Sequence, residues 1–175
     1  FAFSPARASG LWQFMPATGR LYGLQQDWWH DERRDVLKAT EAAYTFLEDM
    51  HGLFEGDWLL ALAAYNSGSG NVRKAQRRNQ RRGKPLDFFS LDLPRETEAY
   101  VPKLLAIARL VRDPEAYELA LHPLPNAPQF AVVETGGQLD LARAADLAGV
   151  DMDTLYRLNP ALNRWSTHPD GPHRL

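Results

Sequence analysis

One uninterrupted apolar run constrains the fold more than any other part of the sequence. The run extends from Trp58 to Tyr65 without a charged side chain, and Asp57 precedes it as a candidate helix cap. A helix that is apolar on every face has to be buried all round. The glycine-rich segment 66–70 ends this helix. We therefore expect a central core helix whose last residues, Tyr65 and Asn66, reach the surface.

Proline, aspartate and glycine mark the boundaries of further helices before residue 113. Proline is favourable at the first position of a helix, aspartate at its cap, and glycine directly after its end. Between these marks, apolar residues recur every three or four positions, as they do on the buried face of a helix. Three helices are predicted. The first begins at Pro16 and ends at Gly23, the second begins after Asp35 and ends at Gly52, and the third begins between 94 and 102 and ends before Asp113.

The sequence changes character after Arg112. Residues 113–129 contain four prolines and are predicted to form an extended linker. Residues 130–133 then have strand character, and two short helices should follow, one ended by Gly149 and one capped by Asp151. The predicted organisation is a helical domain over 1–112, a linker over 113–129 and a small strand-helix-helix domain over 130–175.

The overall composition excludes several classes of protein. Apolar residues make up 45% of the chain and charged residues 24%, as in a globular domain, and no apolar run approaches the roughly 18 residues that cross a bilayer. The absence of cysteine excludes disulfides and thiolate zinc sites. The chain begins Phe1-Ala2-Phe3 without a methionine or a signal peptide, so we expect it to be a fragment of a longer protein.

Three polar motifs follow one another in the helical domain. They contain amide and hydroxyl groups, which both donate and accept hydrogen bonds. The motifs are Ser4-Pro5 with Arg7-Ala8-Ser9-Gly10-Leu11-Trp12-Gln13, then Ala64-Tyr65-Asn66, and then Glu96-Thr97-Glu98-Ala99-Tyr100-Val101. In order and spacing they resemble the motifs of the lysozyme-like lytic transglycosylases, which cut peptidoglycan, although Trp12 replaces the usual methionine. The resemblance covers about residues 1 to 112.

This resemblance implies a fold, a reaction and a set of site residues. The fold would be mainly α, with a lysozyme-like helical domain. One glutamate would act first as acid and then as base, the substrate's 2-acetamido group would act as nucleophile, and the product would be a 1,6-anhydro sugar. That glutamate is expected about six residues before Phe1, so we expect no catalytic residue within this chain. Neither a metal nor a cofactor is expected. The implied substrate-binding residues are Ser4, Gln13, Met15, Tyr65, Asn66 and Tyr100.

The last part of the chain resembles a LysM module, a small α+β domain with a βααβ order that binds N-acetylated glycans. The similarity rests on residues 130–133, on the spacing of the apolar positions and on Leu158-Asn159-Pro160. The closing strand is expected after Leu175, which would leave the module incomplete. We expect this segment to pack onto the helical domain through exposed apolar side chains, namely Leu119, Leu121, Leu124 and Phe130.

Each candidate residue also has a purely structural explanation. Gln13 and Asn66 could stabilise helix ends, while Met15 and Tyr65 could be packing residues. Trp28 and Trp29 are interpreted as core residues, with stacking on sugar rings as the alternative. His30 and His51 lack metal-ligand spacing and are interpreted as surface residues.

Two carboxylates inside the chain are alternatives for the missing acid. Glu41 lies near Tyr44, and Glu96 precedes Tyr100, but neither has the apolar sequence context that raises the pKa of a catalytic glutamate. Glu96 fits better as a first-turn residue that offsets the helix dipole.

The segment from Arg73 to Arg82 contains no acid and would align Arg73, Arg77 and Arg81 on one helix face. Nucleic-acid binding is disfavoured, because the formal net charge is −2 and no aromatic residue interrupts the run. We interpret it as a solvated face, with contact to peptide carboxylates of the cell wall as the alternative.

The sequence therefore predicts a peptidoglycan lytic transglycosylase whose partner is the glycan strand, located in the periplasm and anchored to the outer membrane by a segment outside this chain. A peptidoglycan-binding protein that retains the cleft without the acid is the main alternative. A hydrolytic lysozyme is a third. The products distinguish it, because lysozyme leaves reducing ends and a lytic transglycosylase leaves 1,6-anhydro rings.

Overall fold

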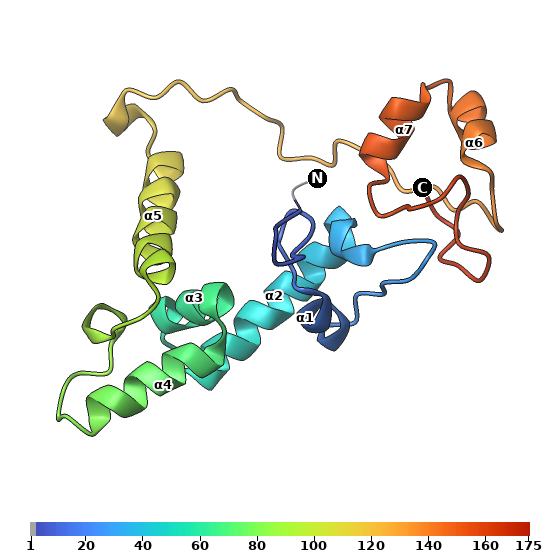
Figure 1. The fold of residues 1–175 in the computed structure, drawn as a ribbon. Coiled ribbons are helices and arrows are strands. Elements are labelled where there is room, and N and C mark those ends of the chain that lie inside the picture. The colour runs from blue at the N-terminus through green and yellow to red at the C-terminus, as the bar shows by residue number, and fades with distance from the viewer. Residues whose placement is uncertain (1–2) are drawn as a thin grey trace. The chain divides into compact units, whose positions relative to one another are not determined.

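The computed structural model describes residues 3–175, and its regular structure is mainly helical (Figure 1), which confirms the predicted fold class. The α-helices are α1 (Pro16–Leu21), α2 (Val36–Leu53), α3 (Trp58–Ser67), α4 (Ser69–Gln80), α5 (Arg95–Arg112), α6 (Leu141–Ala148) and α7 (Met152–Leu158). Single turns of 3-10 helix are η1 (Glu32–Arg34), η2 (Phe88–Ser90) and η3 (Glu115–Tyr117). Within the described part of the chain, no helix has the length and apolar character needed to cross a membrane.

The chain divides into two compact units. The first, called here the N/C unit, combines the chain up to Thr45 with Ala127–Leu175. The second, called the middle unit, is Phe46–Asn126. The division falls within α2. These compact units are not the same divisions as the domains expected from the sequence. The limits 1–112, 113–129 and 130–175 therefore stay a prediction.

Aspartate caps fix the starts of several helices where the sequence places them. Asp57 accepts hydrogen bonds from the backbone N–H groups of Leu59 and Leu60 at the start of α3. Asp140 and Asp151 do the same at the starts of α6 and α7. Such caps contribute about 1 kcal/mol each. Gly149 ends α6 in the left-handed conformation, at φ +67°. The predicted boundaries at Asp57, Gly149 and Asp151 are confirmed, and the cap at Asp140 was not among the predictions.

The core of the middle unit surrounds α3. Leu60, Ala63 and Ala64 of this helix are buried, and they share a cluster with Val72 of α4 and Val101 of α5. The prediction that α3 is buried on every face is wrong at its start. Trp58 is half exposed and stacks on the imidazole of His51, with ring centroids 4.1 Å apart.

In the N/C unit, the buried side chain of Arg33 organises the polypeptide before α1. Its guanidinium forms two hydrogen bonds to Asp31, from Nε at 2.9 Å and from Nη2 at 2.7 Å. Its Nη1 donates to the carbonyl oxygens of Arg7 at 2.7 Å and Phe14 at 3.1 Å. Arg33 thereby fixes both ends of the loop that carries the first motif.

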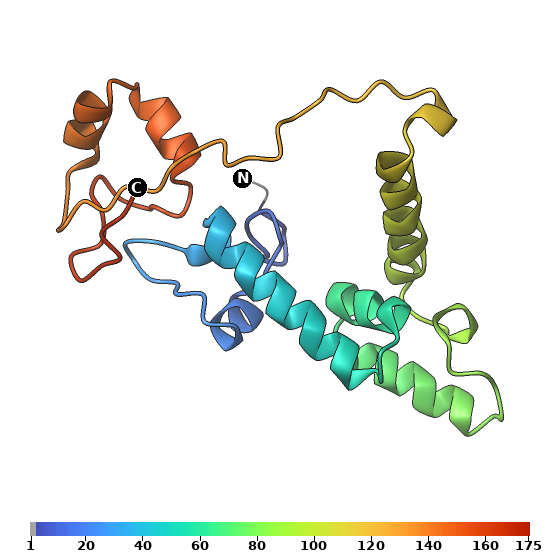
Figure 2. The same ribbon diagram turned by 180° about the vertical axis from the view of Figure 1, so that it is seen from behind.

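The C-terminal part of the N/C unit contains a small core between α6 and α7, which lie side by side in both ribbon views (Figure 1, Figure 2). Leu141, Ala144, Ala145 and Leu155 form this core. The predicted strand at 130–133 is present only as a short antiparallel pairing, in which Val133 and Leu175 exchange two backbone hydrogen bonds of 2.8 and 3.0 Å. The expectation that the pairing segment follows Leu175 is therefore wrong, because residues 173–175 supply it.

This C-terminal part contacts the segment before α2, as expected. The backbone N–H of Asp31 donates to Ala161 at 2.8 Å, and the N–H of Asn163 donates to Trp29 at 2.8 Å. An ion pair of 2.8 Å joins Arg174 to Asp35.

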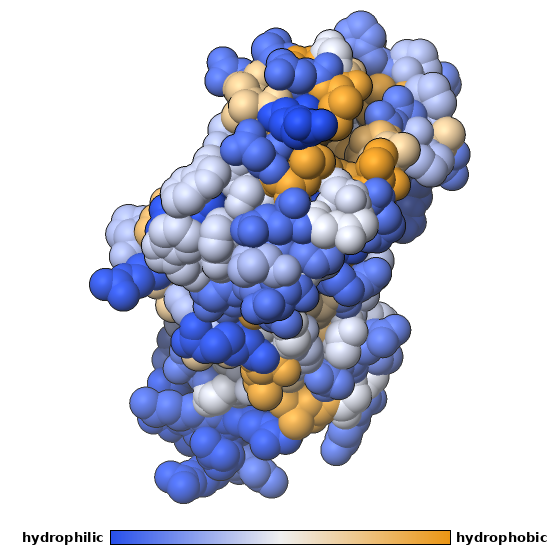
Figure 3. All heavy atoms as spheres, turned by 90° about the vertical axis from the view of Figure 1, so that its right-hand side faces the viewer, coloured by the Kyte–Doolittle hydropathy of each residue, from blue (hydrophilic) through white to orange (hydrophobic). Residues whose placement is uncertain are grey.

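The apolar side chains that were expected to make this contact are not buried. The four apolar residues proposed for docking are exposed: Leu119, Leu121, Leu124 and Phe130. Aromatic rings of Trp28, Trp29 and Trp165 cluster instead, with Arg164 lying 3.8 Å above the ring of Trp28. Trp28 remains 52% exposed, so its interpretation as a core residue is wrong. Figure 3, which looks onto the side of α6 and α7, shows separate apolar patches among hydrophilic side chains.

Replacing Gly10 by alanine tests the packing of the first-motif loop against Arg33. A Cβ atom at Gly10 would lie 1.8 Å from the carbonyl oxygen of Arg33, and Gly10 has φ +81°. Rotating a side chain relieves neither conflict. We expect Gly10→Ala to lower the free energy of unfolding by at least about 2 kcal/mol, measured by chemical denaturation.

Gly70→Ala is the matched control. Gly70 lies in α4, and a Cβ atom there would meet nothing within 4 Å. This variant is expected to gain roughly 0.5–1 kcal/mol from the reduced entropy of the unfolded chain. Equal stability of the Gly10→Ala variant and the parent would contradict the close packing of this loop.

Candidate functional site

The first motif forms a tight loop closed by backbone hydrogen bonds. The N–H of Ser9 donates to the carbonyl of Phe14 at 3.1 Å. At the turn, Gln13 adopts φ +51°, a conformation uncommon for a residue other than glycine. Its Nε2 donates to the carbonyl of Gly10 at 2.8 Å, and its backbone N–H contacts the same oxygen at 3.3 Å. The exposed Gln13 side chain is therefore held by its own loop.

The other two site residues predicted in the N/C unit lie beside this loop. The Ser4 hydroxyl accepts a hydrogen bond from the backbone N–H of Ala8 at 2.9 Å, so Ser4 helps to close the segment before Gln13. Met15 is 42% exposed and precedes α1 as its N-cap residue without a side-chain cap bond. Met15 is thus a surface residue and not a core residue.

The second and third motifs meet in the middle unit. Asn66, at the end of α3, accepts a hydrogen bond through Oδ1 from the hydroxyl of Thr97 at 2.7 Å. Its Nδ2 points to Oε1 of Glu96 at 3.5 Å. Thr97 is only 1% exposed. The buried threonine therefore fixes which way the Asn66 amide faces, and a half-buried amide is presented beside a carboxylate.

The two predicted tyrosines belong to the same part of the middle unit. Burial, and then the neighbouring Tyr100, raise the pKa of Tyr65 above its ordinary value. Burial also raises the pKa of Tyr100. Tyr65 packs against Phe46, with ring centroids 5.1 Å apart, and Tyr100 packs against the core. Both hydroxyls therefore stay protonated at neutral pH.

The structure thus joins Tyr65, Asn66 and Tyr100 in one unit, and Ser4, Gln13 and Met15 in the other. Thr97 belongs to the third motif but was not among the predicted site residues. Its position three residues before Tyr100 in a helix, which puts both on one face, is the signal that identifies it.

One surface pocket touches the first motif at Ser9 without including the predicted site residues. A pocket of about 320 Å³ in the N/C unit is lined by Phe3, Ser9, Arg34, Tyr156, Pro160 and Leu162. None of the six predicted site residues lines it.

The two alternative carboxylates have ordinary surroundings. Glu41 is 74% exposed and lies 3.8 Å from Lys38 in an ion pair. Glu96 lies in the first turn of α5, where its charge offsets the helix dipole, as expected.

Residues 73–80 of the basic segment lie in α4, and Arg81 follows as its C-cap residue. Arg73, Arg77 and Arg81 are exposed, as expected for a solvated face. Arg78 pairs with Asp92 at 2.9 Å.

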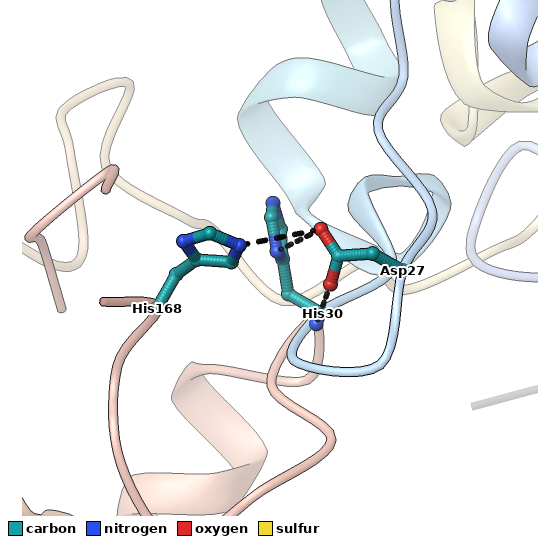
Figure 4. Close-up of side chains that lie close together, drawn as sticks. All are labelled: Asp27, His30 and His168. Carbon is teal, nitrogen blue, oxygen red and sulfur yellow. Dashed lines mark hydrogen bonds and ion pairs between the residues drawn. The ribbon is translucent and has the colours of Figure 1, made fainter. Parts of the chain in front are cut away.

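His30 differs from its predicted surface position, because it is only 4% exposed. Together with Asp27 and His168 it forms a cluster whose ligand atoms all lie within 4.8 Å of one another (Figure 4). Spacing along the chain did not reveal this group, because His168 comes from the C-terminal part and Asp27 and His30 precede α2.

Comparisons with known proteins agree with these motifs. Residues 1–88 match the family described as Transglycosylase SLT domain, and residues 129–175 match the family described as Lytic transglycosylase MltD, LysM-like domain. Membrane-bound lytic murein transglycosylase D of Escherichia coli (strain K12) is 41% identical over 171 residues, which are 98% of this chain and 38% of that protein. Peptidoglycan transglycosylase gp16 of Escherichia phage T7 is 35% identical over 101 residues, which are 57% of this chain and 7% of that protein.

The chain therefore spans less than half the length of both relatives. Its similarity to the transglycosylase D relative was expected from Trp28-Trp29, from Tyr100-Val101-Pro102-Lys103 and from residues 130–133, and it is confirmed. Because the SLT match covers half of the chain, the protein belongs to the transglycosylase SLT family and carries a LysM-like domain of the MltD type.

Proposed function

We propose that this protein is a lytic transglycosylase that cleaves the β-1,4 bond between N-acetylmuramic acid and N-acetylglucosamine in peptidoglycan. The observation that carries this proposal is the oriented amide of Asn66, held by Thr97 beside Tyr65 and Tyr100. Family membership and the two transglycosylase relatives support the same reaction class.

The reaction needs a proton at the leaving oxygen and stabilisation of an oxocarbenium-like transition state. A glutamate would protonate the leaving 4-oxygen while the acetamido carbonyl oxygen of N-acetylmuramic acid attacks C1. That attack closes a five-membered oxazolinium ring. The 6-hydroxyl would then attack C1, break the bond from C1 to the acetamido oxygen, and give its proton to the glutamate. The product is a 1,6-anhydro ring.

The proposed contribution of this chain is to hold the reacting sugar. An acetamido group offers one N–H donor and one carbonyl acceptor, and Asn66 can match either partner. Neutral tyrosine hydroxyls supply further donors in a partly dry environment, where hydrogen bonds are strengthened. Gln13 would contact the glycan from the first-motif loop. Ser4 and Met15 complete the proposed set of substrate-binding residues.

The catalytic glutamate is proposed to lie about six residues before Phe1, by the spacing of the first motif. In this proposal, residues 1–112 form the transglycosylase domain, 113–129 the linker and 130–175 the LysM-like domain. The proposed location is the periplasm, with an outer-membrane anchor outside this chain. The E. coli relative is named as membrane-bound, which supports the proposed anchor.

Asn66→Ala tests the central residue of this site. In a protein extended upstream to include the expected glutamate, turnover on purified peptidoglycan should fall about ten-fold or more, the loss expected when a hydrogen bond of roughly 1.5 kcal/mol disappears. Thr97→Val keeps the side-chain shape but removes the donor to Asn66, so a loss in the same direction is expected. Release of 1,6-anhydro-muropeptides, followed by chromatography, measures both.

Two exposed residues serve as matched controls. Asn71 lies in α4, and Thr45 lies in α2 with its hydroxyl bonded to its own helix. Asn71→Ala and Thr45→Val should leave turnover unchanged. Parent-like turnover in the Asn66→Ala variant would remove Asn66 from the site.

Gln13→Gly separates binding from folding in the first motif. Glycine accepts φ +51° without strain, which offsets the lost hydrogen bond to Gly10, so the variant should fold about as stably as the parent. Turnover should nevertheless fall about ten-fold, because the side-chain amide is lost. Full activity in a stably folded Gln13→Gly variant would show that Gln13 only shapes the loop.

The position of the acid is tested by comparing the chain as it stands with the upstream-extended protein. The extended protein should release anhydro-muropeptides, and changing its added glutamate to glutamine should abolish the release. Release by residues 1–175 alone would contradict the proposal and make Glu41 and Glu96 the next residues to replace. Glycan binding without cleavage in the extended protein would favour a binding protein, and reducing-end products would favour a lysozyme.

A further inference from the structure

Two segments of the N/C unit that are distant in sequence contribute ionisable groups to one point. Oδ2 of Asp27 lies 3.3 Å from Nδ1 of His30 and 3.5 Å from Nε2 of His168 (Figure 4). Among the described residues, these three side chains form a group with metal-ligating atoms within 4.8 Å of one another. Neither the proposed reaction nor the comparisons give this cluster a role.

The environment of His30 is unusual for an imidazole that serves only in packing. Its side chain is nearly fully buried, and neither Nδ1 nor Nε2 has a hydrogen-bond partner. Leaving a buried polar group unsatisfied costs about 1–3 kcal/mol. A ligand that binds the ring nitrogen facing Asp27 would remove part of that cost.

The Asp27 carboxylate is oriented toward the two imidazoles. Its Oδ1 accepts hydrogen bonds from the backbone N–H groups of Trp29 at 2.7 Å and His30 at 2.9 Å, which leaves Oδ2 facing the rings. Burial acts to raise the pKa of Asp27, but the backbone N–H groups of His30 and Trp29 and the nearby imidazoles outweigh it and lower the pKa. Asp27 is therefore charged at neutral pH.

Two of the three distances within the cluster match the edges of a zinc coordination tetrahedron. Two ligand atoms about 2.1 Å from Zn²⁺ at tetrahedral corners lie roughly 3.4 Å apart. The two measured distances from Asp27, 3.3 and 3.5 Å, bracket this value. We propose that Asp27, His30 and His168 form a Zn²⁺ site with a fourth position open to water.

A second carboxylate supports His30 from its other side. Oε1 of the buried Glu32 lies 4.0 Å from Nε2 of His30, beyond hydrogen-bond distance but within ion-pair range. Its Oε2 accepts the backbone N–H of Gln25 at 2.8 Å, which holds the side chain in place. A zinc-bound histidine usually directs its second nitrogen toward such a carboxylate, which fixes the ring and raises its basicity.

One contact works against metal binding and makes the test sharper. The backbone N–H of Asp170 donates to Nδ1 of His168 at 3.0 Å, so without metal the proton of His168 is on Nε2, facing Asp27. Zinc bound to Nε2 would displace this proton, and a neutral imidazole would then carry its proton on Nδ1. Because Nδ1 could no longer accept the hydrogen bond from Asp170, the exposed turn at Asp170 would have to move. Metal binding therefore competes with the proton that His168 directs toward Asp27 and with the hydrogen bond from Asp170.

Zinc at this position would cross-link the segment before α2 to the C-terminal part. Backbone hydrogen bonds and the tryptophan cluster already join these segments. A metal bound only by the folded form adds stability that rises with the free metal concentration. The proposed site would thus stabilise the fold, and it does not depend on the proposed reaction.

The full chain, stripped with a chelator, should be titrated with Zn²⁺ against a chromophoric competitor and separately loaded with Co²⁺. We expect one Zn²⁺ per chain, a micromolar or lower Kd, visible ligand-field bands of a tetrahedral Co²⁺ site, and a higher Tm with zinc. His168→Gln and Asp27→Asn should weaken zinc binding by at least about a hundred-fold, and Glu32→Gln by about ten-fold.

His122→Gln is the matched control, because His122 is exposed in the segment between α5 and α6, and its zinc affinity should equal that of the parent. His168→Gln keeps a side-chain N–H that can face Asp27, so the variant should fold; far-UV circular dichroism without metal checks this. Zinc affinity that survives His168→Gln, or the absence of tetrahedral bands in the parent, would overturn the proposal. The three residues would then form a proton-bridged ion pair only.

Discussion

The buried guanidinium of Arg33 is the interaction on which the N-terminal part of the structure depends. It pairs with Asp31 and donates to the carbonyl oxygens of Arg7 and Phe14, so it spans the first-motif loop from end to end. A planar donor with several fixed N–H groups can do this, and lysine cannot. The left-handed conformations of Arg7 and Gln13 occur within this loop, where the surrounding bonds hold them. Removing one partner of such a buried pair typically costs about 3–5 kcal/mol.

In the middle unit, packing and polar chemistry are joined at the end of one helix. Because helix α3 consists of small and apolar residues, it packs closely against α4 and α5. That packing fixes the position of the end of the helix. Asn66 stands at this end, and Thr97 of α5 orients its amide. The site is thus built on core elements, which keeps the positions of its donors and acceptors nearly constant. A proposed reaction that depends on positioning a substrate acetamido group needs such rigidity.

Local signals carried most of the fold and part of the site. Asp57 and Asp151 mark helix starts because a carboxylate satisfies free N–H groups within a few residues, and no distant contact is needed to recognise this. The motif residues Tyr65 and Asn66 could be named because they follow a core helix. The burial of His30 could not be predicted, because it depends on His168 from the far end of the chain. The contact made by the C-terminal part was also mispredicted: leucines were expected, but tryptophans and backbone groups make it. A sequence does not show whether an apolar side chain contacts a segment that is distant along the chain.

The most direct test of the account is an NMR titration of the ¹⁵N-labelled chain with a soluble peptidoglycan tetrasaccharide. If the motif residues bind the glycan, the side-chain amide of Asn66 and the backbone amide of Thr97 should shift together and fit one Kd, and the backbone amide of Gln13 should shift as well. The account would be contradicted if the resonances of these groups did not change and only those of α4, or only those of α6 and α7, shifted. Glycan would then bind elsewhere on the molecule.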